Sequence, residues 1–311
     1  MVAVAIHGIH VARNSLKENM AGQEFKYSYH IDLDSDSTAT KVLRLVGKGK
    51  KVLELGCGPG HMSKVMAGEL GCKVKAVEID ECAAKKARRY CQDVKVCNLD
   101  ETDLKRLFPT DSFDVIVMAD VLEHLREPEK TLIQAKGLLS PSGKVVISMP
   151  NVAHAGVLSA LLCCSFPYGD IGLLDRTHLR FFTASGLVRL LKDAGYRIKT
   201  WLTSEVAVEY TEFKPFFETL PGMIQDFLLR TPDAKVYQFV VDARIKAKES
   251  MPDGDETDLS DKIQQQIQMD LKERDKWIEK SYLSASDTIL TDTMDERSFI
   301  RRIFPFFKND K

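Results

Sequence analysis

Between residues 51 and 245, the chain alternates short apolar runs with longer amphipathic stretches. Short runs rich in valine, isoleucine and phenylalanine predict strands, whereas apolar positions that recur every three or four residues predict helices. The predicted strands are residues 51–55, 74–78, 94–97, 113–118, 144–149, 198–204 and 236–244. The predicted helices between them are residues 61–70, 81–90, 128–139 and 184–194. This alternation predicts an α/β fold with a doubly wound, mostly parallel, seven-stranded sheet.

The same pattern divides the chain into three parts. Residues 1–46 are expected to form a cap on the substrate side, residues 47–246 the sheet domain, and residues 247–311 a linker and a helical tail. Within the sheet domain, the connections 151–182 and 206–234 are longer than ordinary loops. Long connections near strand ends commonly build lids and pockets, so we expect these two helical insertions to form the substrate pocket.

The tail has two apolar features, and each has two interpretations. Apolar residues recur at helical intervals at Leu259, Ile263, Ile267, Leu271 and Ile278. This stripe suits either a short coiled coil between copies of the chain or a helix packed on the sheet domain. The segment 298–308 mixes phenylalanines with arginines, which suits either an anionic membrane surface or burial against the core.

Residues Val52–Gly60, with the sequence V-L-E-L-G-C-G-P-G, join a buried strand to a glycine-rich turn. Glycine at every second position predicts a turn whose backbone closely approaches a ligand, and the next helix points its N–H groups at that ligand. Glu78 ends the following strand, where a carboxylate suits hydrogen bonds to two ribose hydroxyls. Glu54 would repel a pyrophosphate but suits a positively charged amino group. These residues predict a site for a nucleoside cofactor.

Composition narrows the function classes. The 311 residues are 44% hydrophobic and 29% charged, as in globular proteins, and a net charge of −1 gives no general basic surface for nucleic acid. No apolar run reaches the roughly 20 residues that span a bilayer. The seven cysteines have neither a disulfide framework nor zinc-site spacing, so we expect reduced thiols and a cytoplasmic protein.

The segment E-L-G-C-G-P-G resembles the first motif of class I S-adenosylmethionine-dependent methyltransferases, and Glu78-Ile79-Asp80 resembles their second motif. The resemblance implies their Rossmann-like fold, with an antiparallel last strand, and S-adenosylmethionine as cofactor. Asp100 would face the adenine amino group and Leu99 would pack on the ring, although Asp100 also suits the N-cap of a helix over 100–107. The cofactor contacts implied in this way are Tyr29, Glu54, Gly56, Cys57, Gly58, Gly60, Glu78, Ile79, Leu99, Asp100, Asp120 and Val121.

The segment F-D-V-I-V-M-A-D-V-L-E-H-L, residues 113–125, resembles the fourth motif of the same superfamily. Asp120, Glu123 and His124 have the spacing of one helical face, and together with His178 they suit a site for Mg²⁺, Mn²⁺ or Fe²⁺. Small-RNA 3′-end methylases and ubiquinone-pathway O-methyltransferases carry a similar element, usually with Glu at the position of Asp120. We assign catalytic roles to Asp120, His124 and His178.

Two other interpretations of this cluster remain open. In one, Glu123 and His124 cap the helix and His178 alone is the general base, since a histidine can accept the proton of a hydroxyl at neutral pH. In the other, all four side chains are structural.

Further segments resemble one bacterial group of methyltransferase domains, found with enzymes of polysaccharide and secondary-metabolite biosynthesis. They are residues 29–37, 150–155, 172–183 (G-L-L-D-R-T-H-L-R-F-F-T) and 236–241. The resemblance implies methyl transfer to a hydroxyl, less often an amine, of a small or sugar-containing acceptor, with His178 as base or metal ligand. RNA 3′-end 2′-O-methylation and an inactive cofactor-binding adaptor are the alternatives. We expect a small-molecule or glycan partner, no nucleic acid, and a peripheral membrane or homo-oligomer contact through the tail.

Overall fold

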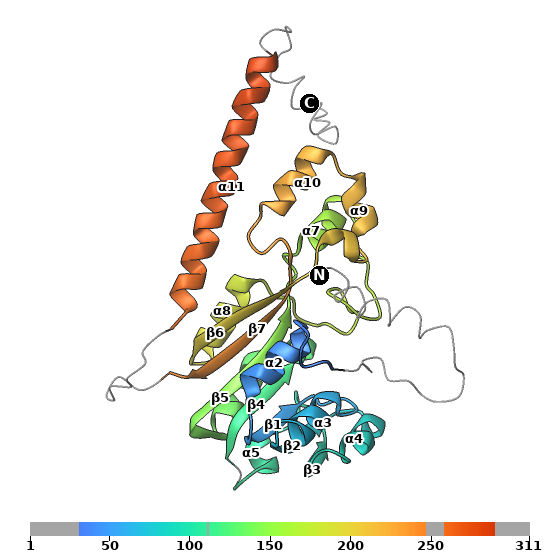
Figure 1. The fold of residues 1–311 in the computed structure, drawn as a ribbon, viewed down its shortest axis with the longest axis vertical. Helices are drawn as coiled ribbons and strands as arrows, with labels where there is room; N and C mark the ends of the chain where they lie inside the picture. Colours follow the sequence, from blue (N-terminus) through green and yellow to red (C-terminus); the bar gives the residue numbers. More distant parts are fainter. Residues whose placement is uncertain (1–30, 111, 247–257, 290–311) are drawn as a thin grey trace, which may run out of the picture.

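A computed structural model of the protein describes residues 31–110, 112–246 and 258–289, apart from the side chains of 282–289. Its centre is one seven-stranded sheet with the order β3-β2-β1-β4-β5-β7-β6 (Figure 1). Neighbouring strands from β3 to β5 pair in parallel, and β7 lies antiparallel to both β5 and β6. The predicted fold class and the antiparallel last strand are therefore confirmed.

All seven predicted strands are present. They are β1 (Lys51–Leu55), β2 (Lys73–Glu78), β3 (Asp93–Val96), β4 (Phe113–Ala119), β5 (Leu139–Pro150), β6 (Tyr196–Glu205) and β7 (Val236–Ile245). β5 is longer than predicted, because Leu139 already pairs with Phe113 of β4 across a register shift. This pairing assigns Leu139 to the sheet, and the helix expected to reach it ends at Lys136.

Helices cover both faces of the sheet. They are α2 (Thr38–Val46), α3 (His61–Gly68), α4 (Glu81–Ala87), α5 (Leu104–Leu107), α6 (Pro128–Lys136) and α8 (Ala184–Asp193). Successive side chains of β4 alternate between the faces: Ile116 and Met118 join the core beneath α6 and α8, whereas Val115 and Val117 join the core beneath α2 and α3. This alternation follows from the two-residue repeat of a strand, and it explains why the buried strands are almost wholly apolar.

The two long connections pack on one another. The first contains α7 (Ala155–Leu162), and the second contains the 3₁₀ helix η3 (Val208–Tyr210), α9 (Lys214–Thr219) and α10 (Gly222–Leu229). Leu173 and Leu174 from the first share one apolar cluster with Phe213 and Leu228 from the second. Beyond the carboxyl ends of the strands, the two connections thus form one helical unit, whose role as a substrate pocket stays a prediction (Figure 1).

The tail helix α11 (Ser260–Ile289) runs along the sheet domain and past the insertions (Figure 1). Leu259, Ile263 and Ile267 pack against the core beneath α8. Of the two interpretations of the apolar stripe, packing on the sheet domain is the one observed for these three residues. Residues 298–308 lie outside the described part of the chain. Among the described helices, none combines the length and the apolar character needed to cross a membrane.

Candidate functional site

The glycine-rich turn leaves β1 at the point where the strand order reverses, between β1 and β4. Open parallel sheets bind ligands at this point, outside the carboxyl ends of the strands. Gly56, Gly58 and Gly60 have φ of 69°, 53° and 87°, a region that favours glycine. A Cβ on Gly56 would lie 2.7 Å from Val121 Cγ2, and one on Gly60 would lie 2.9 Å from Ala87 Cα. A Cβ on Gly58 would meet nothing within 4 Å, so this backbone faces open space.

Glu78 ties the tip of β2 to the glycine turn. Its carboxylate accepts hydrogen bonds from the backbone N–H groups of Gly58 (2.6 Å), Ile79 (2.8 Å) and Asp80 (2.9 Å). Asp80 in turn caps α4, accepting from Ala83 N at 2.9 Å. The Ile79 side chain is 66% exposed, which leaves an apolar surface beside the carboxylate. An acid next to an exposed apolar side chain suits a ribose and its flat base.

Glu54 lies deeper, at 2% exposure, and accepts a hydrogen bond from the Ser63 hydroxyl of α3. Burial, together with the nearby charge of Glu78, raises the pKa of Glu54 to about 8, against the lowering effect of the Ser63 hydrogen bond. A bound cation would stabilise the ionised form and offset both effects. The position therefore matches the predicted contact with a positively charged amino group.

Asp100 and Leu99 follow β3, as predicted, but Asp100 does not begin a helix. The helix α5 starts at Leu104, and Asp103 is its cap, accepting from Lys105 N at 3.0 Å. Asp100 instead accepts from Arg126 N at 2.9 Å, which holds the loop after β3 against the loop after β4. The N-cap prediction is wrong because Asp103 lies one residue before the helix and takes that role.

Asp120 ends β4 in a left-handed conformation, with φ of 53°. Its carboxylate accepts hydrogen bonds from Ser148 Oγ of β5 and Gln238 Nε2 of β7, both at 2.8 Å. The 3₁₀ helix η2 (Leu122–His124) begins only two residues later. The prediction that Asp120, Glu123 and His124 share one helical face is therefore wrong, since the left-handed residue separates Asp120 from the helix.

Glu123, His124 and His178 do come together. One ligand atom from each lies within 4.8 Å of the others, and Asp120 does not belong to this group. Glu123 is 1% exposed, and neither of its carboxylate oxygens has a hydrogen-bond partner in the described part of the chain. Burial, then the charge of Asp120, raises the pKa of Glu123 well above its usual value. A buried carboxylate without hydrogen bonds is costly unless a cation or a proton compensates it.

Backbone carbonyls orient both histidines. His178 Nδ1 lies 3.2 Å from the carbonyl oxygen of Leu173, and His124 Nδ1 lies 3.2 Å from that of Thr177. Because a carbonyl oxygen only accepts, each Nδ1 carries a proton, and in the neutral imidazole the lone pair lies on Nε2. Such contacts fix the tautomer and the ring direction of a base or metal ligand.

The loop that carries His178 is attached to the end of β4. The carbonyl oxygen of Glu123 accepts from Leu179 N (2.8 Å) and Arg180 N (3.0 Å). Arg180 Nη2 donates to the carbonyl oxygen of Arg126 at 2.7 Å, two residues beyond η2. These contacts join the loop of the first insertion that carries His178 to the short segment 120–126, whose Val121 lies beside Gly56.

Several hydrogen-bond partners in the site have no sequence signal of their own. They are Ser63, Ser148, Gln238, Thr177 and the carbonyl of Leu173. Cys57 lies buried in the glycine turn and Val121 lies beside Gly56, and their contact with the cofactor stays a prediction. Tyr29, the remaining predicted contact, lies outside the described residues.

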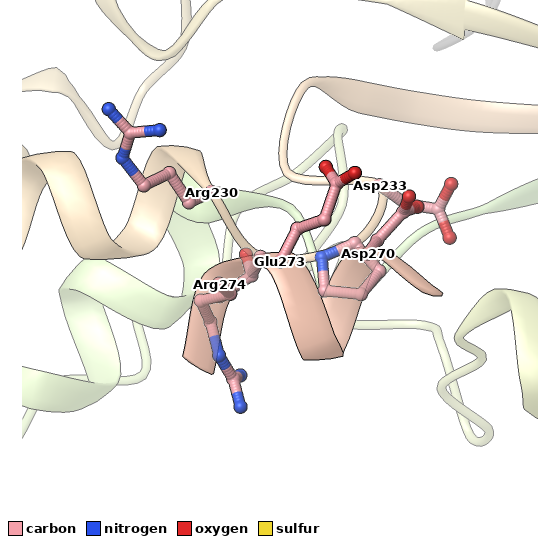
Figure 2. Close-up of a pocket in the computed structure, with 7 residues that line it drawn as sticks. Arg230, Asp233, Asp270, Glu273 and Arg274 are labelled. Atoms are coloured by element: carbon pink, nitrogen blue, oxygen red, sulfur yellow. The ribbon is translucent and has the colours of Figure 1, made fainter. Parts of the chain in front are cut away.

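A separate cavity of about 280 Å³ lies between α11 and the segment that follows α10 (Figure 2). Arg230, Asp233, Asp270, Glu273 and Arg274 line it together with Thr231 and Pro232. None of these belongs to the predicted site. The cavity and the predicted site therefore share no residue.

Comparison with known proteins identifies the class of site. Residues 32–200, more than half of the chain, match a family model described as a methyltransferase domain. The chain belongs to this methyltransferase family. It is a class I methyltransferase that uses S-adenosylmethionine, and the glycine turn, Glu54 and Glu78 stay the predicted contacts of this cofactor.

Two curated relatives bear the name ubiquinone biosynthesis O-methyltransferase. That of Psychrobacter arcticus is 29% identical over 59% of this chain and 71% of its own length. That of Idiomarina loihiensis is 33% identical over 46% of this chain and 59% of its own length. Among solved structures, magnesium protoporphyrin IX methyltransferase of Synechocystis, with bound S-adenosylhomocysteine, shows 15% identity and a TM-score of 0.45 over 68% of this chain and 82% of its own.

Proposed function

We propose that this methyltransferase transfers the methyl group of S-adenosylmethionine to a hydroxyl of a small-molecule acceptor bound beside His178. The observation that carries the proposal is the grouping of Glu123 and His124, in η2 after β4, with His178 of the first insertion. The O-methyltransferase names of the relatives support a hydroxyl acceptor. We also propose a reducing, cytoplasmic setting, supported by seven cysteines that are all free.

The reaction needs little more than orientation and removal of one proton. The acceptor oxygen attacks the methyl carbon in line with the S–CH₃ bond, which breaks and leaves S-adenosylhomocysteine. His178 Nε2 accepts the hydroxyl proton as the oxygen attacks, and the Leu173 carbonyl stabilises the resulting imidazolium at Nδ1. The imidazolium lies within 4.8 Å of the Glu123 carboxyl, so its charge offsets the burial that raises the pKa of Glu123 and favours the carboxylate form.

A divalent ion fits the same three side chains. The unbonded carboxylate of Glu123 and two imidazoles with lone pairs on Nε2 form a donor set suited to Mn²⁺ or Fe²⁺, and less closely to Mg²⁺. Glu123, His124 and His178 would hold the ion. When bound, it would lower the pKa of an acceptor hydroxyl. The metal stays a proposal, as does histidine acting as base alone.

Aromatic rings extend outward from the histidines and favour a flat acceptor. Ring centroids are 4.8 Å apart for His124–His178, 6.2 Å for His178–Phe181, 5.6 Å for Phe181–Phe166 and 5.0 Å for Phe166–Tyr168. Tyr168, at the outer end, is 57% exposed. A phenolic ring can stack on such a series while it presents a hydroxyl to His178. A sugar hydroxyl, implied by the sequence resemblance, is the competing acceptor.

The acceptor is tested with methyl-labelled cofactor and product mass spectrometry. Catechols and phenols, free and nucleotide-linked sugars, and an RNA oligonucleotide with a free 3′ end are compared. We expect labelled phenolic products. Labelled sugars would move the acceptor to the glycan class, and labelled RNA would contradict a small-molecule acceptor. Cofactor binding without any product would favour the inactive adaptor.

The role of His178 is tested with the same assay. The variant His178→Ala should bind S-adenosylmethionine normally but transfer methyl groups about 10²–10⁴-fold more slowly, because a positioned base supplies this factor. Arg176→Ala is a control in the same loop, since Arg176 pairs with exposed Asp170 at 2.7 Å. Full activity in excess EDTA would contradict the metal version and leave His178 as the base, whereas normal turnover of His178→Ala would contradict both.

A further inference from the structure

A residue of its own loop contributes to the orientation of His178. His178 Nδ1 donates to the carbonyl oxygen of Leu173, five residues earlier, at 3.2 Å. The Leu173 side chain is 2% exposed and belongs to the apolar cluster shared by the two insertions. Any movement of the Leu173 backbone would therefore redirect the imidazole, so whatever fixes Leu173 also fixes the proton acceptor.

Two side chains from other elements hold the backbone of Leu173. Glu212 lies in the second insertion and Tyr237 lies in β7. Burial raises the pKa of both side chains, and the Leu173 main chain lowers it, as a nearby N–H group does. Gly172 makes their approach possible: it has φ of 99°, and a Cβ there would lie 2.6 Å from Glu212 Oε1 and 3.2 Å from the Tyr237 hydroxyl. Both oxygens thus lie against the same glycine, which immediately precedes Leu173.

The Tyr237 ring is itself fixed. It packs edge to face on His154, with ring centroids 5.7 Å apart. His154 is fully buried, with Nδ1 accepting from Gly156 N at 3.1 Å and Nε2 lying 2.7 Å from the Val206 carbonyl oxygen. A tyrosine held in this way provides a fixed point for the loop, which is the usual arrangement behind an oriented ligand or base.

We propose that Glu212 and Tyr237 are positioning residues that hold the Gly172–Leu173 backbone so that the Leu173 carbonyl keeps His178 in its Nδ1–H tautomer. The catalytic consequence rests on the proposed function of His178, but the positioning itself does not. Neither side chain touches the reacting atoms. They act through the main chain, and they join the second insertion and β7 to a site carried by the first insertion.

The proposal is tested by ¹⁵N NMR of protein labelled at histidine, with the His178 signals assigned by their loss in His178→Asn. In wild type near pH 8, His178 should show a single Nδ1–H tautomer. In Tyr237→Phe with Glu212→Ala, it should show a mixture of both tautomers, and methyl transfer to the active acceptor should fall about 10-fold or more. The single variant Glu212→Gln keeps an oxygen that can accept from the Leu173 N–H. With Tyr237 unchanged, it should therefore give the wild-type His178 spectrum.

Two controls keep the outcome interpretable. Glu212 is exposed, so Glu212→Ala alone should fold, and Glu209→Ala on neighbouring η3 is its matched control. A His178 spectrum unchanged in the folded double variant would overturn the proposal. A spectrum that changes as expected in a protein that methylates no acceptor would support the positioning and contradict the proposed function, so the two failures are distinguishable.

Discussion

At the scale of single residues, two glycine substitutions distinguish the cost of backbone strain from the loss of a ligand contact. Gly58 and Gly49 have nearly the same φ, 53° and 68°, and a Cβ on either would meet nothing within 4 Å. Alanine in the left-handed region costs about 1–2 kcal/mol, so both substitutions should lower the unfolding free energy by that amount. Only Gly58→Ala places a methyl group in the space above the cofactor turn. We therefore expect at least a 10-fold loss of S-adenosylmethionine affinity for Gly58→Ala and none for Gly49→Ala.

Calorimetric titration with the cofactor and urea unfolding measure the two effects separately. Equal cofactor affinity in both variants would mean that the open space over Gly58 is not the binding surface. A much larger stability loss for Gly58→Ala than for Gly49→Ala would instead indicate a steric contact that the glycine backbone avoids.

Glu54 gives a pH dependence whose sign can be worked out. Burial raises its pKa from 4.5 to about 8, so between these values the folded state holds a proton that the unfolded chain has released. The contribution of Glu54 to the unfolding free energy is therefore greatest below pH 4.5. It falls as the pH rises, by on the order of 4 kcal/mol at pH 8. Glu54→Gln should lack this slope, and exposed Glu69→Gln should keep it.

Urea unfolding at several pH values, with and without cofactor, measures the slope. Saturating S-adenosylmethionine should reduce it in wild type, because the cofactor's amino group favours the carboxylate form of Glu54. Parallel curves for wild type and Glu54→Gln would show that Glu54 does not hold a proton in the folded state.

The residues that could be predicted are those whose role is set by neighbouring sequence. Gly56, Gly58 and Gly60 belong to one tight turn, and Glu78 ends the adjacent strand, so spacing alone located them. Asp120 could not be placed, because its conformation depends on Ser148 and Gln238, which approach only when β5 and β7 join the sheet.

At the scale of elements, the threonine that ends the insertion motif has a structural role. Thr183 is the N-cap of α8, and its hydroxyl accepts from Gly186 N at 3.2 Å. Thr183→Ala should lower the unfolding free energy by about 1 kcal/mol, and Thr183→Ser should restore it, because both hydroxyl residues cap helices. Thermal or urea unfolding measures the change. A large loss of methyl transfer in Thr183→Ala at unchanged stability would assign this residue to the acceptor site instead.

Element boundaries show which physical signals a sequence carries. The buried strands were predictable because apolar runs persist wherever both faces of a sheet are covered. The ends of helices were less predictable. Helix α4 ends at Ala87 and not at residue 90, although the residues after Ala87 also favour a helix. The association of the two insertions depends on contacts such as those of Phe213 with the first insertion, which no local pattern records.

At the scale of the whole molecule, α11 links the sheet domain to the insertions. Its first turns pack on the core, with Ser185 Oγ donating to Gln264 Oε1 at 3.3 Å. Further along, the Arg274 guanidinium lies 5.3 Å from the Phe227 ring, and Arg230 of the neighbouring segment lies 4.9 Å from the Trp277 ring. These paired cation–π contacts join α10 to α11 and border the cavity of Figure 2.

A chain that ends after residue 248 should still fold and bind S-adenosylmethionine, because β7 completes the sheet at Ile245. It should lose on the order of 2–5 kcal/mol of unfolding free energy, since Leu259, Ile263 and Ile267 are partly buried on the core. In the full chain, Ile263→Ala should cost more than Met269→Ala, which is 51% exposed. Urea unfolding and calorimetry test both statements, and liposome sedimentation with light scattering tests whether the tail binds membranes or a second copy. An insoluble truncated chain, or one that no longer binds the cofactor, would show that α11 belongs to the catalytic core.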